Sequence, residues 1–290
     1  MNKHKLKLIS SMAIFGTVGI FVRNIPAPSS FIAVVRGFGG MLFMLLAAII
    51  GKRGISKESI KKNLPKLFLS GAFIGINWIL LFEAYRYTTV ATATLCYYLA
   101  PVIIILVSPF LLKEKLTLKK LLCVIGALVG MIFVSGVAEN GIPSFSEIKG
   151  VLLGTGAAVF YASAVILNKK FTDIEASDRT LTQLGFAAAA VLPYVLLTQD
   201  VAAIRLNYAE IILLAVVTVV HTGISYAMYF ASIKELDTQT VAIFSYIDPI
   251  VAIILSAVIL NESLTVYGII GAVLILGSTF ISELPDKKKI

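Results

Sequence analysis

Residues 75–117 read GINWILLFEAYRYTTVATATLCYYLAPVIIILVSPFLLKEKLT, and residues 223–265 read GISYAMYFASIKELDTQTVAIFSYIDPIVAIILSAVILNESLT. The two stretches align without a gap at an offset of 148 residues, and 12 of the 43 aligned positions are identical. Apolar residues match often by chance, so we give most weight to pairs such as Pro101 with Pro249. Together the matches predict an internal repeat that relates the two halves of the chain.

The composition around these stretches is that of a membrane protein with several spans. The chain has 290 residues, of which 58% are hydrophobic and only 14% are charged, and its mean hydropathy is +0.94. Soluble domains are roughly 45–50% apolar and about 25% charged. The composition therefore excludes a soluble fold and a disordered chain. Because the basic residues lie between apolar runs, we expect no nucleic-acid partner. Cys96 and Cys123 show no metal-ligand spacing, and we expect no metal and no cofactor.

Apolar runs of about 20 residues, the length that crosses a bilayer, recur along the whole chain. The first run follows basic residues and could be read as a signal peptide, but the repeat requires it as a retained first helix. We therefore expect an all-α integral membrane protein with ten transmembrane helices, arranged as two five-helix repeats over residues 1–140 and 141–290. The predicted spans are 6–22, 30–50, 64–84, 88–112, 118–137, 148–168, 179–198, 208–232, 238–260 and 265–282.

The basic residues also predict the orientation of the chain in the cell membrane. If the spans alternate in direction, 20 of the 25 Lys and Arg residues fall on one side and four on the other. The positive-inside rule then places both termini in the cytoplasm. Since each half holds an odd number of spans, the second half enters the membrane upside down. Inverted repeats are typical of secondary transporters, whose substrate sites lie near the bilayer midplane.

The two matched segments resemble the signature segments of EamA-type transporters of the drug/metabolite transporter superfamily. The resemblance rests on the paired prolines and on a Glu before Leu-Thr in each half, and it includes Arg36 in the second span. Asp248 matches an acidic residue common in the second half, whereas Ala100 replaces the usual small polar residue of the first. The resemblance implies a ten-helix transporter of small metabolites, often an exporter. It leaves amino acids, other metabolites, toxic cations and sugar conjugates open as substrates.

Ionisable groups inside a span cost roughly 2.5–3.5 kcal/mol on insertion and are candidates for function. Asp248 and His221 lie near the middle of their spans, where they predict a proton-coupling or cation-binding pair. The alternatives are a packing bond between the halves, or a histidine that hydrogen-bonds a neighbouring Ser or Tyr. Arg36 and Glu83 lie nearer the outer surface. They suit an outer charge pair, a carboxylate-binding role for Arg36, or a structural role.

Further candidates surround the two matched prolines. Pro101 and Pro249 predict helix bends, and the carbonyl groups freed by such bends need a partner or a water-filled cavity. Glu114 and Glu262, at the ends of the same spans, predict symmetric end contacts or helix caps. Aromatic and hydroxyl residues nearby are expected to line the cavity, although packing is the alternative for each: Trp78, Tyr97, Tyr98, Ser225, Tyr226, Tyr229, Ser245 and Tyr246.

Glycines four residues apart predict places where helices approach each other closely. The pairs are Gly71 with Gly75, Gly126 with Gly130, and Gly150 with Gly154.

These patterns favour a secondary transporter that exports a small metabolite, with an amino acid or related zwitterion as the best candidate, by alternating access and with proton coupling. An uncoupled facilitator and an exporter of organic cations or other metabolites remain alternatives. An intramembrane enzyme is a remote one, because His221, Ser225 and Asp248 come with no nucleophile or metal motif; we expect no enzyme activity. The expected partners are a small-molecule substrate, the lipid bilayer and protons, for a monomer or a homodimer.

Overall fold

The computed structural model describes residues 3–111, 116–135, 144–233, 235–236, 241 and 244–284. All the regular elements in these ranges are helices, which confirms the predicted all-α class. In chain order the elements are α1 (Lys3–Arg23), α2 (Ser29–Ile50), α3 (Lys57–Lys62), α4 (Leu64–Tyr87), α5 (Val90–Tyr97), α6 (Ala100–Leu111), α7 (Leu118–Val134), α9 (Phe145–Asn168), α10 (Ala176–Thr198), the 3₁₀ helix η1 (Val201–Ala203), α11 (Tyr208–Thr218), the π-helix η2 (Val219–Ile224), α12 (Ser225–Ile233), α14 (Ile247–Ile259) and α15 (Val266–Glu283).

Within the described ranges, seven helical stretches are long and apolar enough to cross a membrane. Five are the single helices α1, α2, α4, α9 and α10, and the other two are composite, namely Val90–Leu111 and Tyr208–Ser232. Ile247–Ile259 and Val266–Ser282 are shorter apolar helices. The chain is therefore a membrane protein with several spans.

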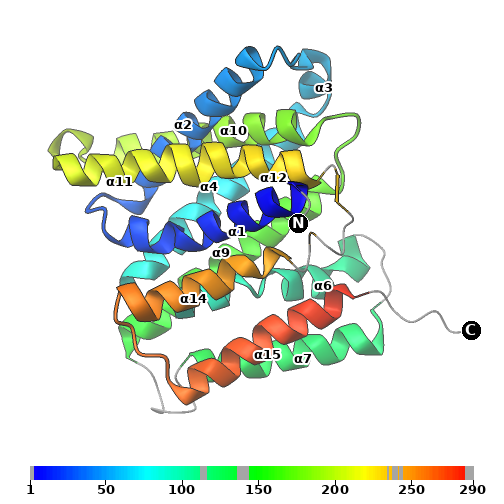
Figure 1. The fold of residues 1–290 in the computed structure, drawn as a ribbon, viewed down its shortest axis with the longest axis vertical. Helices are drawn as coiled ribbons and strands as arrows, with labels where there is room; N and C mark the ends of the chain where they lie inside the picture. The colour runs from blue at the N-terminus through cyan, green and yellow to red at the C-terminus, as the bar shows by residue number, and fades with distance from the viewer. Residues whose placement is uncertain are drawn as a thin grey trace, which may run out of the picture.

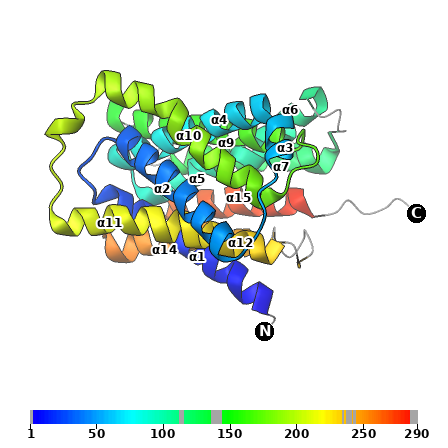
Figure 2. The same cartoon turned by 90° about the horizontal axis from the view of Figure 1, so that it is seen from above.

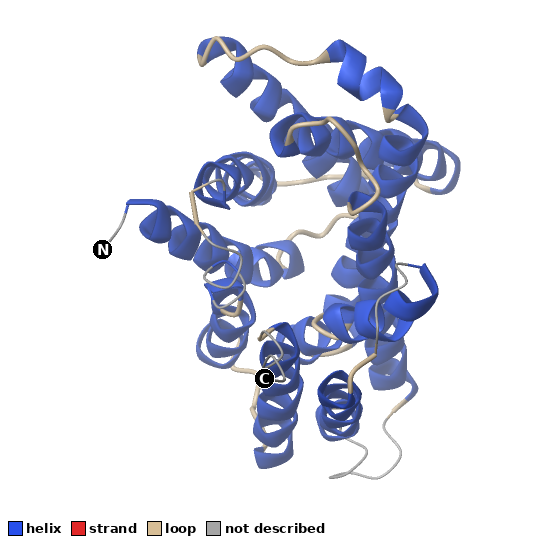
Figure 3. Ribbon diagram, turned by 90° about the vertical axis from the view of Figure 1, so that its right-hand side faces the viewer, coloured by secondary structure: helices blue, strands red, loops and turns tan. Residues whose placement is uncertain are grey.

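The long helices run side by side as one bundle (Figures 1 and 2). In the centre, α4 packs against α9 and α10, and α2 packs against α10. Helix α1 lies against α12 and α14, while α7 and α15 pair along one edge of the bundle. Figure 3 shows the same bundle turned so that many of the helices are seen nearly end-on.

The two ends of the bundle differ in charge. One end, called here the basic end, is formed by residues 51–63 and 169–175. There Lys66 Nζ donates to the carbonyl oxygen of Lys170 over 2.8 Å, and Lys62 Nζ donates to Asp173 over 2.6 Å. This hydrogen bond and the charge of Lys62 lower the pKa of the exposed Asp173. The other end, called here the opposite end, is formed by residues 24–28, 199–207 and 260–265.

The threonines of the matched Leu-Thr motif begin the last helix of each half. The side chain of Thr117 accepts a hydrogen bond from the backbone N–H of Lys120 at the start of α7. In the same way, the side chain of Thr265 accepts from the N–H of Gly268 at the start of α15. A helix leaves its first backbone N–H groups without intrahelical partners, and such an N-cap supplies one. Threonine therefore stands at both matched positions because each one caps the helix that follows it.

The predicted close helix contacts at glycine pairs are confirmed. A Cβ atom added at Gly75 would lie 2.7 Å from the carbonyl oxygen of Ala187 on α10, and one at Gly154 would lie 3.1 Å from that of Ala93 on α5. A Cβ atom at Gly130 would lie 2.8 Å from the carbonyl oxygen of Gly271 on α15. Side chains larger than hydrogen would push these helix pairs apart.

Candidate functional site

The matched prolines stand at breaks between helical segments in the middle of the bundle. Helix α5 ends at Tyr97, and α6 begins at Ala100, so Pro101 lies in its first turn. Pro249 likewise lies in the first turn of α14, after a turn at Tyr246. Proline is tolerated in a first turn, where its missing N–H is not needed. The helix bends expected at Pro101 and Pro249 stay a prediction. Residues at both breaks, Tyr97 and Tyr98 at the first and Ser245 and Asp248 at the second, line one cavity.

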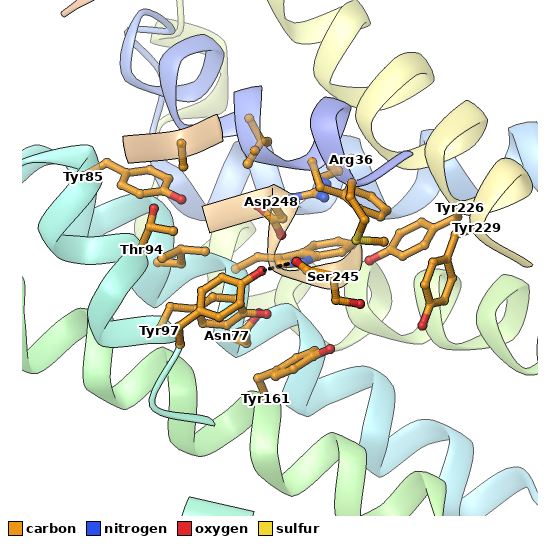
Figure 4. Close-up of a pocket in the computed structure, with 18 residues that line it drawn as sticks. Arg36, Asn77, Tyr85, Thr94, Tyr97, Tyr161, Tyr226, Tyr229, Ser245 and Asp248 are labelled. Carbon is orange, nitrogen blue, oxygen red and sulfur yellow. Dashed lines mark hydrogen bonds between the residues drawn. The ribbon is translucent and has the colours of Figure 1, made fainter. Parts of the chain in front are cut away.

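The cavity has a volume of about 220 Å³ and lies between α1, α2, α4, α5, α9, α12 and α14 (Figure 4). At about 30 Å³ per water molecule, it has room for roughly seven waters. Eight of the 18 residues that line it are aromatic, and the charged side chains in the wall are Arg36 and Asp248. The aromatic residues are Phe15, Trp78, Tyr85, Tyr97, Tyr98, Tyr161, Tyr226 and Tyr229.

Arg36, on α2, is held from two sides. Its Nε donates a hydrogen bond to Thr222 Oγ1 over 2.7 Å. Its guanidinium carbon lies 4.4 Å from the ring centroid of Trp78 and 5.5 Å from that of Phe82, which is a cation–π arrangement. In the described part of the chain, the two terminal nitrogens have no hydrogen-bond or ion-pair partner. The guanidinium therefore offers two donor nitrogens to the cavity that it lines.

Asp248, in the first turn of α14, supplies the negative charge. The hydroxyl of Tyr98 hydrogen-bonds the carboxylate, and it also lies 3.5 Å from the carbonyl oxygen of Ser245. Across the described ranges, no ion pair joins Asp248 to Arg36 or to another cation. Two opposite charges thus face one small aromatic cavity without neutralising each other.

A second space of about 420 Å³, called here the vestibule, continues from the cavity. The two share Tyr97, Tyr98, Tyr161, Ser245 and Asp248. From there the vestibule passes Pro101 and Tyr246 and reaches Lys120, Lys169 and Ser282 near the basic end. The vestibule therefore extends the space beside Asp248 toward that end of the bundle.

Glu262 ties helices together at the opposite end. Its carboxylate accepts hydrogen bonds from the backbone N–H of Val90 over 2.9 Å, from Ser256 Oγ and from Arg23. It thus caps the N-terminus of α5 and joins α5 to the ends of α1 and α14. The expected role of Glu262 as an end contact or cap agrees with this geometry. Its counterpart Glu114 lies outside the described residues.

Glu83 lies in a separate pocket of about 620 Å³ at the opposite end. Ser29 Oγ donates to its carboxylate over 2.7 Å, and Arg86 Nε lies 3.8 Å from it. Arg86 also donates to the carbonyl oxygen of Ala27 in the α1–α2 connection. The structure therefore does not bring Glu83 together with Arg36, and its contacts hold that connection against α4.

His221 is buried in the π-helix η2, and it does not line the cavity. Its Nε2 lies 2.7 Å from Thr17 Oγ1 on α1, and its Nδ1 lies 3.3 Å from the carbonyl oxygen of Val216. The ring also packs edge-on against Phe21. The proposed pairing of His221 with Asp248 is therefore corrected, because the two side chains have different neighbours.

The remaining candidates divide between the cavity and other surroundings. Ser225 Oγ donates to the carbonyl oxygen of Val220 and is absent from the cavity wall, while Tyr246 lines the vestibule. The other aromatic candidates and Ser245 line the cavity. Sequence reasoning missed several further cavity residues, namely Met12, Phe15, Asn77, Tyr85, Thr94 and Tyr161. Asn77, Tyr85 and Thr94 lie inside the matched segment 75–117, which was a signal, whereas the others lie in other spans and had none.

Comparisons with known proteins agree with this architecture. The EamA-like transporter family matches residues 5–136 and again 148–284. The uncharacterised transporter YxxF of Bacillus subtilis (strain 168) is 28% identical over 93% of this chain and 86% of its own length. An uncharacterised transporter of Archaeoglobus fulgidus is 26% identical over 97% of both chains. A solved crystal structure with 18% identity covers 97% of this chain and 98% of its own, with a TM-score of 0.67. The chain therefore belongs to the EamA-like transporter family and is a membrane transporter.

Proposed function

We propose that the protein exports an apolar amino acid, or a closely similar small zwitterion, by alternating access. The observation that carries this proposal is the pair of unneutralised opposite charges, Arg36 and Asp248, in one aromatic cavity. The guanidinium suits a carboxylate. The carboxylate of Asp248 and the aromatic faces suit an ammonium group. A volume of about 220 Å³ is below the roughly 300–1,000 Å³ of drug-sized pockets and favours a small ligand.

We further propose ten transmembrane helices in two inverted repeats, with α7, α14 and α15 completing the set. The packing supports this arrangement. Helix α1 packs on α12 and α14. Its counterpart in the second half, α9, packs on α4 and α6, which are the counterparts of α12 and α14 in the first half. The pairs α2–α10 and α7–α15 each join a helix to its own counterpart. Exchanging the two halves therefore reproduces the main contacts, as a two-fold relation requires.

Loop charge supports a cytoplasmic basic end, with both termini on that side. In this orientation the vestibule opens to the cytoplasm, while Glu262 and the Glu83–Arg86 contacts close the outer end. This is the conformation in which an exporter takes up its substrate.

The orientation predicts opposite labelling of two exposed positions, Lys57 and Ala202. Each is replaced by cysteine in a protein that also carries Cys96→Ala and Cys123→Ala. In intact cells an impermeant maleimide should label only the Ala202→Cys protein, and permeabilised cells should label both. Equal labelling of the two proteins in intact cells would contradict this topology.

Proton coupling through Asp248 is part of the proposal, and an uncoupled facilitator is its alternative. A pH-independent exchange of substrate down its gradient would favour the facilitator. The aromatic wall beside Asp248 also favours a second candidate, the export of organic cations, since ammonium groups bind aromatic faces.

Transport into proteoliposomes separates these candidates. We expect radiolabelled L-leucine to exchange across the membrane and to be preferred over 3-methylbutylamine, the same molecule without its carboxylate, by about tenfold or more. A hydrogen bond to a charged group contributes roughly 1.5–3 kcal/mol, and about 1.4 kcal/mol is tenfold in affinity. Transport of the amine but not of L-leucine would replace the zwitterion proposal with the organic-cation one. An imposed pH gradient should drive accumulation of L-leucine if transport is proton-coupled.

A further inference from the structure

We infer that Thr222, on the π-helix η2 of the second half, is a positioning residue that sets the affinity for the substrate's carboxylate by holding the guanidinium of Arg36. The inference rests on the proposed function, because it assumes a substrate that carries a carboxylate. Thr222 itself is absent from the cavity wall, so it acts through Arg36.

The Thr222 hydroxyl donates one hydrogen bond and accepts another, and together the two bonds fix its orientation. The hydroxyl donates to the carbonyl oxygen of Val217 over 3.1 Å. It accepts the hydrogen bond from Arg36 Nε over 2.7 Å. Thr222 is 0% exposed, so water does not compete for either bond. The oxygen therefore presents a fixed acceptor to one nitrogen of the guanidinium.

The π-helix makes this contact available. The hydroxyl of Thr222 bonds to the carbonyl oxygen of the residue five positions earlier. The hydroxyl of Ser225 and the ring of His221 also bond to carbonyl oxygens five residues earlier. Such single π turns occur often at functional sites. On the facing helix, α2, a Cβ atom at Gly40 would lie 2.5 Å from Thr222 Cγ2. A glycine at that position therefore lets the π turn approach close enough for the Arg36–Thr222 bond.

The two supports of Arg36 leave one edge of the guanidinium for the ligand. Thr222 occupies Nε, and the Trp78 ring covers one face at 4.4 Å. What remains is the pair of terminal nitrogens, and their parallel N–H bonds match the two oxygens of a carboxylate. Without an acceptor at Nε, the guanidinium can turn about its side-chain bonds and present a less suitable edge. We expect carboxylate recognition to weaken while ammonium recognition at Asp248 is unchanged.

The test compares Thr222→Val with wild type in proteoliposomes, with L-leucine exchange as the assay and 3-methylbutylamine as a competing inhibitor. We expect the KM for L-leucine to rise about tenfold in Thr222→Val, the loss of a charge-assisted hydrogen bond. The rate at saturation and the inhibition constant of the amine should each stay within about twofold. Thr222→Ser keeps the hydroxyl and should restore most of the affinity. Thr222→Cys, whose thiol is a weak acceptor, should give the same selective loss and serves if the valine protein does not fold.

Thr218→Val is the matched control, because Thr218 also faces α2, with its methyl group nearest Gly39, but its hydroxyl donates to the carbonyl oxygen of Leu214. Thr218→Val should leave the KM for L-leucine and the inhibition constant of 3-methylbutylamine within about twofold of wild type. In a protein that already carries Arg36→Gln, adding Thr222→Val should not raise the KM for L-leucine further, since the two residues act as one unit. An equal loss of L-leucine and amine affinity, or no loss at all, would overturn the positioning role of Thr222. If wild type itself fails to bind L-leucine, it is instead the zwitterion proposal that fails.

Discussion

Replacing Asp248 with asparagine is expected to abolish pH-driven transport while leaving part of the substrate exchange intact. Asparagine keeps the size of the side chain, but it cannot ionise. Asp248 faces the cavity and the vestibule with no cation paired to it in the described part of the chain. An unpaired carboxylate is costly in a dry apolar site and inexpensive where water enters. Alternating access to water at this position would therefore release a proton on one side only.

The measurement is accumulation of L-leucine in proteoliposomes with and without an imposed pH gradient. Asp173→Asn is the matched control, because it makes the same chemical change at an exposed surface pair with Lys62, and it should behave as wild type. Accumulation by Asp248→Asn against a gradient, with unchanged pH dependence, would show that Asp248 serves helix packing instead.

A second large effect is expected from adding one methyl group at Gly16 on α1. A Cβ atom there would lie 2.4 Å from the carbonyl oxygen of Asp248 and 2.8 Å from Val251 Cβ on α14. The backbone atom cannot move aside without shifting α14, and overpacking of this kind costs roughly 1–3 kcal/mol. We expect Gly16→Ala to lower the Tm of the purified protein by several degrees. Because the shift displaces Asp248, transport should fall as well.

Gly277→Ala provides the comparison for this change. Gly277 lies in α15, where an added Cβ atom would meet nothing within 4 Å. Alanine also has a higher helix propensity than glycine, so this protein should be at least as stable as wild type. Equal Tm values for the two variants would mean that α1 and α14 can separate at no cost.

The glycine pairs show which part of the helix packing could be predicted from the sequence. Spacing identified the glycines at helix contacts, since only small residues permit such an approach. The identity of each partner helix was not predictable, because lipid and protein interior are equally apolar and leave no polar stripe to mark the exposed face. The same limit hid Asn77, Tyr85 and Tyr161 as cavity residues.

The sequence predicted how deep in its span a residue lies, but it did not predict in which direction around the helix the side chain points. Asp248 and Arg36 were recognised as buried charges from their positions in apolar runs, and the structure places both in the cavity wall. His221 was assigned to the same depth as Asp248, but its ring faces Thr17 and Phe21 instead. The π turn that carries His221 had no clear signal beyond a polar run within an apolar span.

The π turn also fixes the angular phase of the helix that follows it. Each residue of an α-helix advances about 100° around the axis, and a π turn contains one residue more than an α turn. Tyr226 and Tyr229, on α12, therefore face a direction about one residue's rotation away from the one that an unbroken α11 would give them. Both rings line the cavity. The aromatic wall on that side depends on a single extra residue, and losing one residue from η2 would turn both tyrosines away from the cavity without altering either of them.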